Sequence, residues 1–425
     1  MKKALSILLL CGLLCLCACG TAPQSEDTPQ DATPQDGVTD NYKAAVAAID
    51  SGDYATAYDL LKGQEDEQSK GLLKDFVFVP TAVTNQTPDN AAIGSSVTLT
   101  YDAEGRLLKR TFTNPTEVIE TAYTYDADGR TVKEVYTAYG NVHTTTYTYN
   151  ADGRLSEKHY VSDGGDIRYT YTYDEKGNLT EEKSVSSDGE ETATTYQYND
   201  AGKETLRRTE DNDGVRYEYE TAYHDNGNVH TCSVRRSYES RTYTFEYDEQ
   251  GRLWREWNHP DGADPALKME RTYDENGHLL QTHYPNTGGT VKYVYDTQGL
   301  LTETLDGAHH TVYTYDENGN LLTETRTVSE AFNRRKEYTY DASGRVTEEV
   351  ITYANDRSET TLFVYDEDGN VASRTYTGFD VETDSDSAAV VTAQWTVFYY
   401  PDGVPEAVQA ELEELAKPLT TVEAS

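Results

Sequence analysis

The sequence predicts an all-β repeat protein in which antiparallel β-hairpins form one long twisted or spiralling sheet. A tyrosine followed directly by Asp, Asn or His, and then three residues later by glycine, occurs twelve times, from Tyr101 to Tyr365, at intervals of 20 to 26 residues. Before each motif, aromatic residues and threonines tend to alternate, as in 144–149, and this is the period of a half-buried strand. A fixed period of this length is typical of a repeat architecture rather than of separate domains.

Each motif predicts a hairpin turn. In Tyr125-Asp126-Ala127-Asp128-Gly129 the first aspartate can accept a hydrogen bond from the backbone two residues on, and the glycine can adopt positive φ. An asparagine in the aspartate position offers the same kind of oxygen, so we expect it to substitute without loss. The structural turn residues are Tyr125, Asp126, Gly129, Tyr149, Asn150, Gly153, Tyr173, Asp174, Gly177, Tyr247, Asp248, Gly251, Tyr315, Asp316, Gly319, Tyr340, Asp341, Gly344, Tyr365, Asp366 and Gly369.

Substitution of a turn glycine tests this assignment. Gly153→Val should destabilise its hairpin by about 1 kcal/mol or more, because positive φ is costly for a branched side chain. Thermal unfolding of the two proteins measures the effect, and an unchanged melting temperature would contradict the turn.

The number of strands bears on whether the sheet can close. Twelve repeats of two strands give about two dozen strands, which at about 4.8 Å each make a sheet roughly 115 Å wide. Closed into a ring, such a sheet would be about 37 Å across, too wide for side chains from opposite walls to fill. We therefore expect the sheet to stay open and to twist or spiral.

The first twenty residues predict export. Two lysines precede an apolar stretch, 4–16, that is short for a membrane span. Its end, Leu16-Cys17-Ala18-Cys19, resembles the lipobox of bacterial lipoproteins. That resemblance implies removal of residues 1–18, a lipid on Cys19, and attachment to the outer side of a bacterial membrane, in a Gram-positive envelope. An ordinary secretory signal is the alternative.

Between the lipidation site and the repeats, two segments are expected. Residues 19–40 lack apolar periodicity and predict a lipidated, disordered tether. Residues 41–75 predict a helical hairpin that caps the open end of the sheet, with Asp40 and Asp53 as N-caps. The hairpin resembles a single tetratricopeptide unit around Gly52-Asp53-Tyr54, and independent peptide binding is the alternative to capping.

The repeat domain is expected to span residues 76–400. Residues 401–425 then hold a capping helix, Glu406 to Lys417, and a tail, because Pro405 suits a first helical position and Pro418 ends the helix.

Composition excludes several classes of partner. The net charge of −39 argues against nucleic acid, whose binding surfaces are basic, and disfavours anionic membrane surfaces. After signal removal and acylation of Cys19, Cys232 is the one remaining thiol, so no intrachain disulfide is expected.

No catalytic or metal-binding constellation stands out, and we expect no enzyme, no cofactor and no dedicated metal site. Carboxylates such as Asp126 and Asp128 recur in every turn, which indicates that they serve the turn. The same turns resemble the start of a calcium loop without its later glutamate, so weak calcium binding stays an alternative. Trp254 and Trp257 are the candidate ligand contacts; three residues apart in a strand they should face opposite sides, and core packing is the alternative.

The repeated Tyr-Asp-x-x-Gly-[Arg/Asn]-[Leu/Val] pattern resembles the YD repeat (RHS repeat) of Rhs proteins, cell-wall-associated bacterial repeat proteins and teneurins. The resemblance covers roughly 70% of the chain and implies long antiparallel sheets wound into a spiral or shell. Larger relatives enclose a C-terminal toxin domain, for which this chain has no counterpart.

These observations favour a surface-anchored repeat lipoprotein that binds an unknown protein or carbohydrate at the cell envelope. A structural spacer without a specific ligand, and an accessory or immunity partner of an RHS-type toxin, are the alternatives.

Overall fold

The computed structural model describes residues 39–86, 94–236, 239–329, 331–380 and 385–416. The predicted signal peptide, the predicted lipidation site Cys19, most of the predicted tether and residues 417–425 lie outside the described residues.

The described chain forms four helices and 26 strands. The helices are α1 Asp40–Asp50, α2 Tyr54–Leu61, α3 Glu67–Leu73 and α4 Glu406–Ala416. The strands are β1 Phe76–Gln86, β2 Ser95–Tyr101, β3 Leu107–Thr113, β4 Val118–Tyr125, β5 Thr131–Ala138, β6 Asn141–Tyr149, β7 Leu155–Ser162, β8 Gly165–Tyr173, β9 Leu179–Ser186, β10 Glu191–Tyr198, β11 Glu204–Asp211, β12 Gly214–Tyr223, β13 Val229–Arg236, β14 Glu239–Tyr247, β15 Leu253–Pro260, β16 Ala266–Tyr273, β17 Leu279–Tyr284, β18 Gly289–Tyr295, β19 Leu301–Asp306, β20 His309–Tyr315, β21 Leu321–Val328, β22 Ala331–Tyr340, β23 Val346–Tyr353, β24 Ser358–Tyr365, β25 Val371–Asp380 and β26 Ser385–Tyr399.

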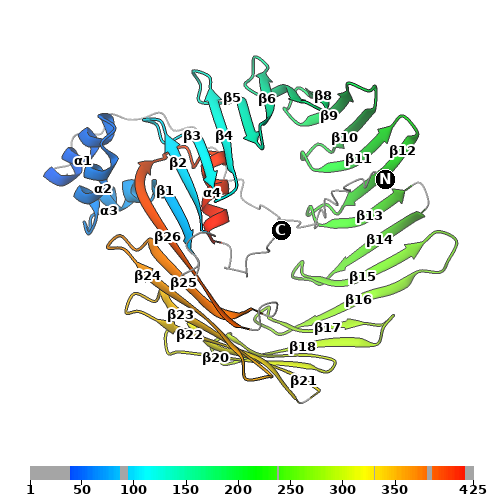
Figure 1. The fold of residues 1–425 in the computed structure, drawn as a ribbon. Helices are drawn as coiled ribbons and strands as arrows, with labels where there is room; N and C mark the ends of the chain where they lie inside the picture. Colours follow the sequence, from blue (N-terminus) through cyan, green and yellow to red (C-terminus); the bar gives the residue numbers. More distant parts are fainter. Residues whose placement is uncertain (1–38, 87–93, 237–238, 330, 381–384, 417–425) are drawn as a thin grey trace.

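The sheet is closed. Every strand pairs antiparallel with the next in sequence, and β26 returns to pair with β1 from Phe76↔Tyr399 to Gln86↔Val390. The twelve hairpins predicted from the tyrosine–glycine motifs are β2/β3 to β24/β25, and β1 and β26 join the two ends of this array (Figure 1).

The expectation of an open, spiralling sheet is therefore wrong. That expectation assumed that side chains must fill the interior of a closed ring. In the structure, some side chains on the inner wall are exposed to solvent instead. Tyr217 and Tyr284 lie on the same sheet face as the repeat tyrosines, which is the inner face, and are 40% and 39% exposed. Tyrosine tolerates this position because its ring is apolar and its hydroxyl is polar.

The seam between β1 and β26 is covered on both faces. Phe76, with its neighbour Phe78, packs against helices α1 and α2, which lie outside the ring in Figure 1. Val79, on the other face of β1, is fully buried on the inner side with Leu107 and with Val408 of α4, which lies inside the ring. Alternation along β1 thus supplies two apolar faces, and burial of both stabilises the closure.

Two polar contacts hold these helices in place. Lys62, at the end of α2, forms an ion pair with Asp368 in the turn between β24 and β25. Inside the ring, Arg110 of β3 pairs with Glu411 of α4 at 2.9 Å. The outer helices and α4 therefore tie the seam to neighbouring hairpins.

The helical segment differs from expectation in three details. Thr39, rather than Asp40, caps α1, accepting from the backbone N–H of Tyr42 at 3.1 Å, whereas Asp53 caps α2 as its position predicts. A third helix, α3, follows with Asp66 as its cap. The helices cover the outside of the seam, because a closed sheet has no open end to cap.

Candidate functional site

The repeat tyrosines form a ladder of hydrogen bonds around the ring. Each phenol donates to a backbone carbonyl at the start of the return strand in the preceding repeat, as Tyr173 does to Leu155 at 2.8 Å. The same bond is made by Tyr125, Tyr149, Tyr198, Tyr223, Tyr273, Tyr295, Tyr315, Tyr340 and Tyr365, at 2.7 to 3.1 Å. Tyr101 donates in the same way to Pro80 of β1, which extends the ladder into the seam.

The ladder compensates for pairing that stops short between repeats. Backbone pairing between strands β7 and β8 stops at Glu157↔Thr170, and Leu155 lies two residues beyond this last pair. Its carbonyl would have no strand partner, and the phenol of Tyr173 supplies one. Because a buried carbonyl without a donor is costly, each repeat depends on the tyrosine of the next.

A pair of variants in one strand tests this dependence. Tyr173→Phe should lower the free energy of unfolding by about 1–3 kcal/mol, because it leaves the Leu155 carbonyl without its donor. Tyr171→Phe, two residues earlier on the same face, should cost less, since the structure shows no hydrogen bond from that phenol. Urea unfolding measures both, and equal losses would contradict the proposed role of the ladder.

The turns use the aspartate side chain twice. One oxygen of Asp126 accepts from the backbone N–H groups of Asp128 and Arg130, at 3.0 and 2.9 Å, and the other accepts from the Arg130 Nε at 2.8 Å. The bond from the Arg130 side chain leads the causes that hold the pKa of Asp126 below its usual value. Gly129 has φ 81°, which closes the turn without strain.

Asparagine is not a full substitute in these turns. Asn150 still accepts from the backbone of Asp152 and Arg154, at 3.0 and 2.9 Å. Its amide nitrogen cannot accept, and the Arg154 guanidinium turns to Asp152 instead, at 3.4 Å. The prediction that asparagine would substitute without loss holds for the backbone and fails for the ion pair.

The residue after each turn glycine links neighbouring repeats. The Arg130 guanidinium lies 4.8 Å from the ring centroid of Tyr149, and Arg252 lies 4.6 Å from that of Tyr273. Lys203 also donates to the carbonyl of Gly227 in the next turn at 2.6 Å. Cation–π contact and hydrogen bonding therefore stabilise the rim formed by the turns. The repeated motif contains this position, but the motif alone does not predict its contact with the next repeat.

The two candidate tryptophans contact one ion pair. The Arg255 guanidinium lies 3.9 Å from the centroid of the Trp254 ring. It pairs most closely with Glu270, Nη2 to Oε1 at 2.6 Å, and its Nη1 also lies 3.9 Å from a Glu246 oxygen. The other oxygen of Glu246 accepts from Trp257 Nε1 at 2.9 Å. The register shift between Glu246 and Tyr247, which recurs at the tyrosine of each hairpin, places Trp254 as the extra residue of β15, and a second shift lies between Glu256 and Trp257. Side-chain exposures of 32% for Arg255 and 41% for Glu246 leave this cluster accessible.

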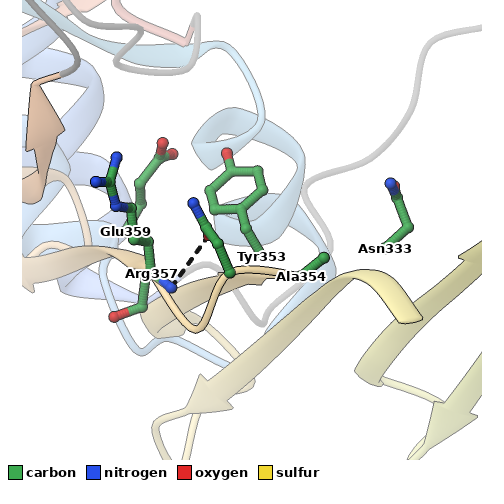
Figure 2. Close-up of a pocket in the computed structure, with 7 residues that line it drawn as sticks. Asn333, Tyr353, Ala354, Arg357 and Glu359 are labelled. Atoms are coloured by element: carbon green, nitrogen blue, oxygen red, sulfur yellow. Dashed lines mark hydrogen bonds between the residues drawn. The ribbon is translucent and has the colours of Figure 1, made fainter. Parts of the chain in front are cut away.

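A shallow depression lies where β22, β23 and β24 meet the loops that join the repeats. It encloses about 470 Å³ and is lined by Asn333, Tyr353, Ala354, Asn355, Arg357, Ser358 and Glu359. Figure 2 shows Asn333 on one side of it and Tyr353, Arg357 and Glu359 on the other. Sequence reasoning did not select these residues; the available signal was Asp356, where other turns carry glycine.

In the part of the chain that the structure describes, no three metal-ligating side chains gather in one place. No helix among the described residues is long and apolar enough to cross a bilayer. The closed sheet, the hydrogen bonds of its repeat tyrosines and its turns form a shell made of repeats.

Comparison with known proteins agrees with this class. The family model of the teneurin YD shell matches residues 167–328. Teneurin-m of Drosophila melanogaster is 32% identical over 74 residues, which are 17% of this chain and 3% of that protein. Teneurin-3 of Danio rerio is 27% identical over 153 residues, 25% of this chain and 6% of that protein. The crystal structure of TcdB2-TccC3 without its hypervariable C-terminal region is 14% identical, with a TM-score of 0.31, and the match covers 69% of this chain and 22% of that one.

The chain thus spans a small fraction of the length of these relatives. Over residues 167–328 the chain matches the YD-repeat family.

Proposed function

We propose that this protein is a non-enzymatic lipoprotein whose YD-repeat shell binds a partner at the bacterial cell surface. The lipobox around Cys19 and the tether after it would hold the shell on the outer side of the membrane. The observation that carries binding rather than a uniform spacer is the Trp254–Arg255–Trp257 cluster. It breaks the repeat pattern and places two large aromatic side chains around a partly exposed ion pair.

Aromatic and arginine side chains together dominate many protein interfaces, which supports this cluster as a contact surface. A protein or carbohydrate ligand fits this surface, whereas the net charge of −39 opposes a polyanion such as nucleic acid.

Proximity crosslinking on intact cells, read by mass spectrometry, tests the proposal. We expect one dominant partner that survives high salt, and its loss in the Trp254→Ala/Trp257→Ala double variant. A matched control is Tyr139→Ala, because Tyr139 is a 76% exposed aromatic residue in the loop between β5 and β6, away from β15. A diffuse set of abundant envelope neighbours, unchanged in the double variant, would favour the spacer instead.

Anchoring is tested separately. Cys19→Ser should abolish incorporation of an alkyne-labelled fatty acid and release the protein into the medium. Continued membrane fractionation of this variant without label would contradict lipidation at Cys19. An accessory role beside a related toxin would appear as a toxin chain among the crosslinked partners.

A further inference from the structure

The loop joining β23 to β24 has the same backbone hydrogen bonds as the loop joining β9 to β10 but carries different side chains. Two hydrogen bonds define the shared backbone. Tyr353 N–H donates to Arg357 O at 2.9 Å and Asp356 N–H to Tyr353 O at 3.0 Å. In the loop joining β9 to β10, the corresponding bonds join Ser186 to Glu190 and Gly189 to Ser186, each at 3.0 Å. One backbone conformation therefore carries two sets of side chains, and the turn itself does not require the tyrosine, aspartate and arginine.

Asp356 adopts φ 60°, the left-handed region in which Gly189, at φ 89°, is unstrained. A non-glycine residue there stores strain, and strain of this kind gathers at functional sites. Aspartate tolerates the conformation better than most residues, so the cost is modest.

Glu359 is the polar centre of the depression beside this loop. Burial, followed by the charge of Glu359, raises the pKa of the phenols of Tyr353 and Tyr376. The carboxylate oxygens of Glu359 can accept hydrogen bonds from a ligand.

On the opposite side, Asn333 is exposed and its side-chain amide makes no hydrogen bond with the described residues. Arg357 and Glu359 balance in charge. The lining thus combines a tyrosine ring, alanine and a few hydrogen-bonding groups with no net charge, in a volume within the range of ligand sites, about 300–1,000 Å³.

We propose that this depression binds a neutral saccharide unit. A sugar presents one apolar face to the ring of Tyr353, while its hydroxyls donate to Glu359 and exchange hydrogen bonds with the Asn333 amide, which both donates and accepts. A neutral ligand is also unaffected by the acidic charge of the chain, which would repel a polyanion. This site lies apart from the tryptophan cluster of the proposed function, on different strands.

Titration calorimetry of the full-length protein in a non-glycosidic detergent tests the site, with N-acetylglucosamine and glucose oligomers of two to four units as probes. We expect saturable binding of at least one series. Asn333→Ala should weaken this binding at least tenfold. The melting temperature of the variant is measured alongside, and an unchanged value shows that the loss does not come from misfolding. Asp356→Gly should bind as the parent protein does, because it keeps the backbone conformation and removes a side chain that does not line the depression.

Absence of binding by both series at millimolar concentration would overturn the proposal. So would binding that Asn333→Ala and Glu359→Gln leave unchanged. If Trp254→Ala/Trp257→Ala abolishes sugar binding while Asn333→Ala does not, the saccharide site belongs to the tryptophan cluster and this assignment fails. Failure here leaves the crosslinking test of the proposed function unaffected, because that test reads a partner on cells.

Discussion

Gly105→Ala is expected to lower the free energy of unfolding by about 2–4 kcal/mol, whereas Gly153→Ala should cost about 1 kcal/mol. Both glycines occupy the same turn position with positive φ, 76° and 79°. They differ in what an added Cβ would meet. At Gly105 it would lie 2.7 Å from Phe398 Cγ and from the Tyr400 hydroxyl, two rings of the seam core.

At Gly153 the nearest atom is Arg130 Nη1, at 3.2 Å, the far end of a side chain that can move. Gly105 is also bound to the seam directly, since the buried Tyr400 hydroxyl donates to its carbonyl at 2.8 Å. The Gly105 variant should therefore add overpacking of the closure to the strain that both variants share.

Chemical unfolding of the two variants at equal protein concentration measures the difference. Equal losses would indicate that the seam core yields to the extra methyl group, and would contradict the view that Gly105 is fixed by close packing against β26. Limited proteolysis provides a second measurement. The Gly105 variant should be cleaved near the seam faster than the parent protein.

The repeat pattern was sufficient to predict the hairpins but not their closure. Turn glycines and alternating tyrosines are local signals, and they placed all twelve hairpins. Closure depends on β1 and β26, whose pairing joins residues more than 300 positions apart, such as Phe76 and Tyr399. The available clue was that Phe76-Val77-Phe78-Val79 is apolar on both faces, as a strand covered on both sides must be.

The candidate site was predictable only in part. Trp254 and Trp257 were recognisable as departures from the repeat, but their link through Arg255 and Glu246 depends on register shifts that alternation alone does not reveal. The depression beside Tyr353 brings together residues from three strands. Only Asp356, an aspartate at a glycine position, marked that loop in the sequence.

Alkaline pH should unfold the shell between about pH 10 and 12. Burial, followed by the charge of Glu134, raises the pKa of Tyr123 to about 12, and burial likewise raises the pKa of Tyr125 to about 12. For Tyr171 and Tyr338, burial and then the charges of Glu182 and Glu349 raise the pKa to about 12.

The ordinary pKa of tyrosine, which applies in the unfolded chain, is about 10. A tyrosine whose pKa is higher than this in the folded state holds its proton more tightly when the protein is folded. The stability that this provides is complete below pH 10 and is lost as the pH rises towards 12. Because such tyrosines recur along the inner wall, the losses add up in one cooperative structure.

The measurement is circular dichroism against pH, together with tyrosinate absorbance at 295 nm. We expect the absorbance of these phenols to rise together with unfolding, near pH 11 to 12. Ionisation of all tyrosines near pH 10 while the sheet stays folded would contradict their burial. Tyr171→Phe provides the control, because it removes one linked proton and breaks no hydrogen bond that the structure shows. Its stability should therefore fall less steeply with pH than that of the parent protein.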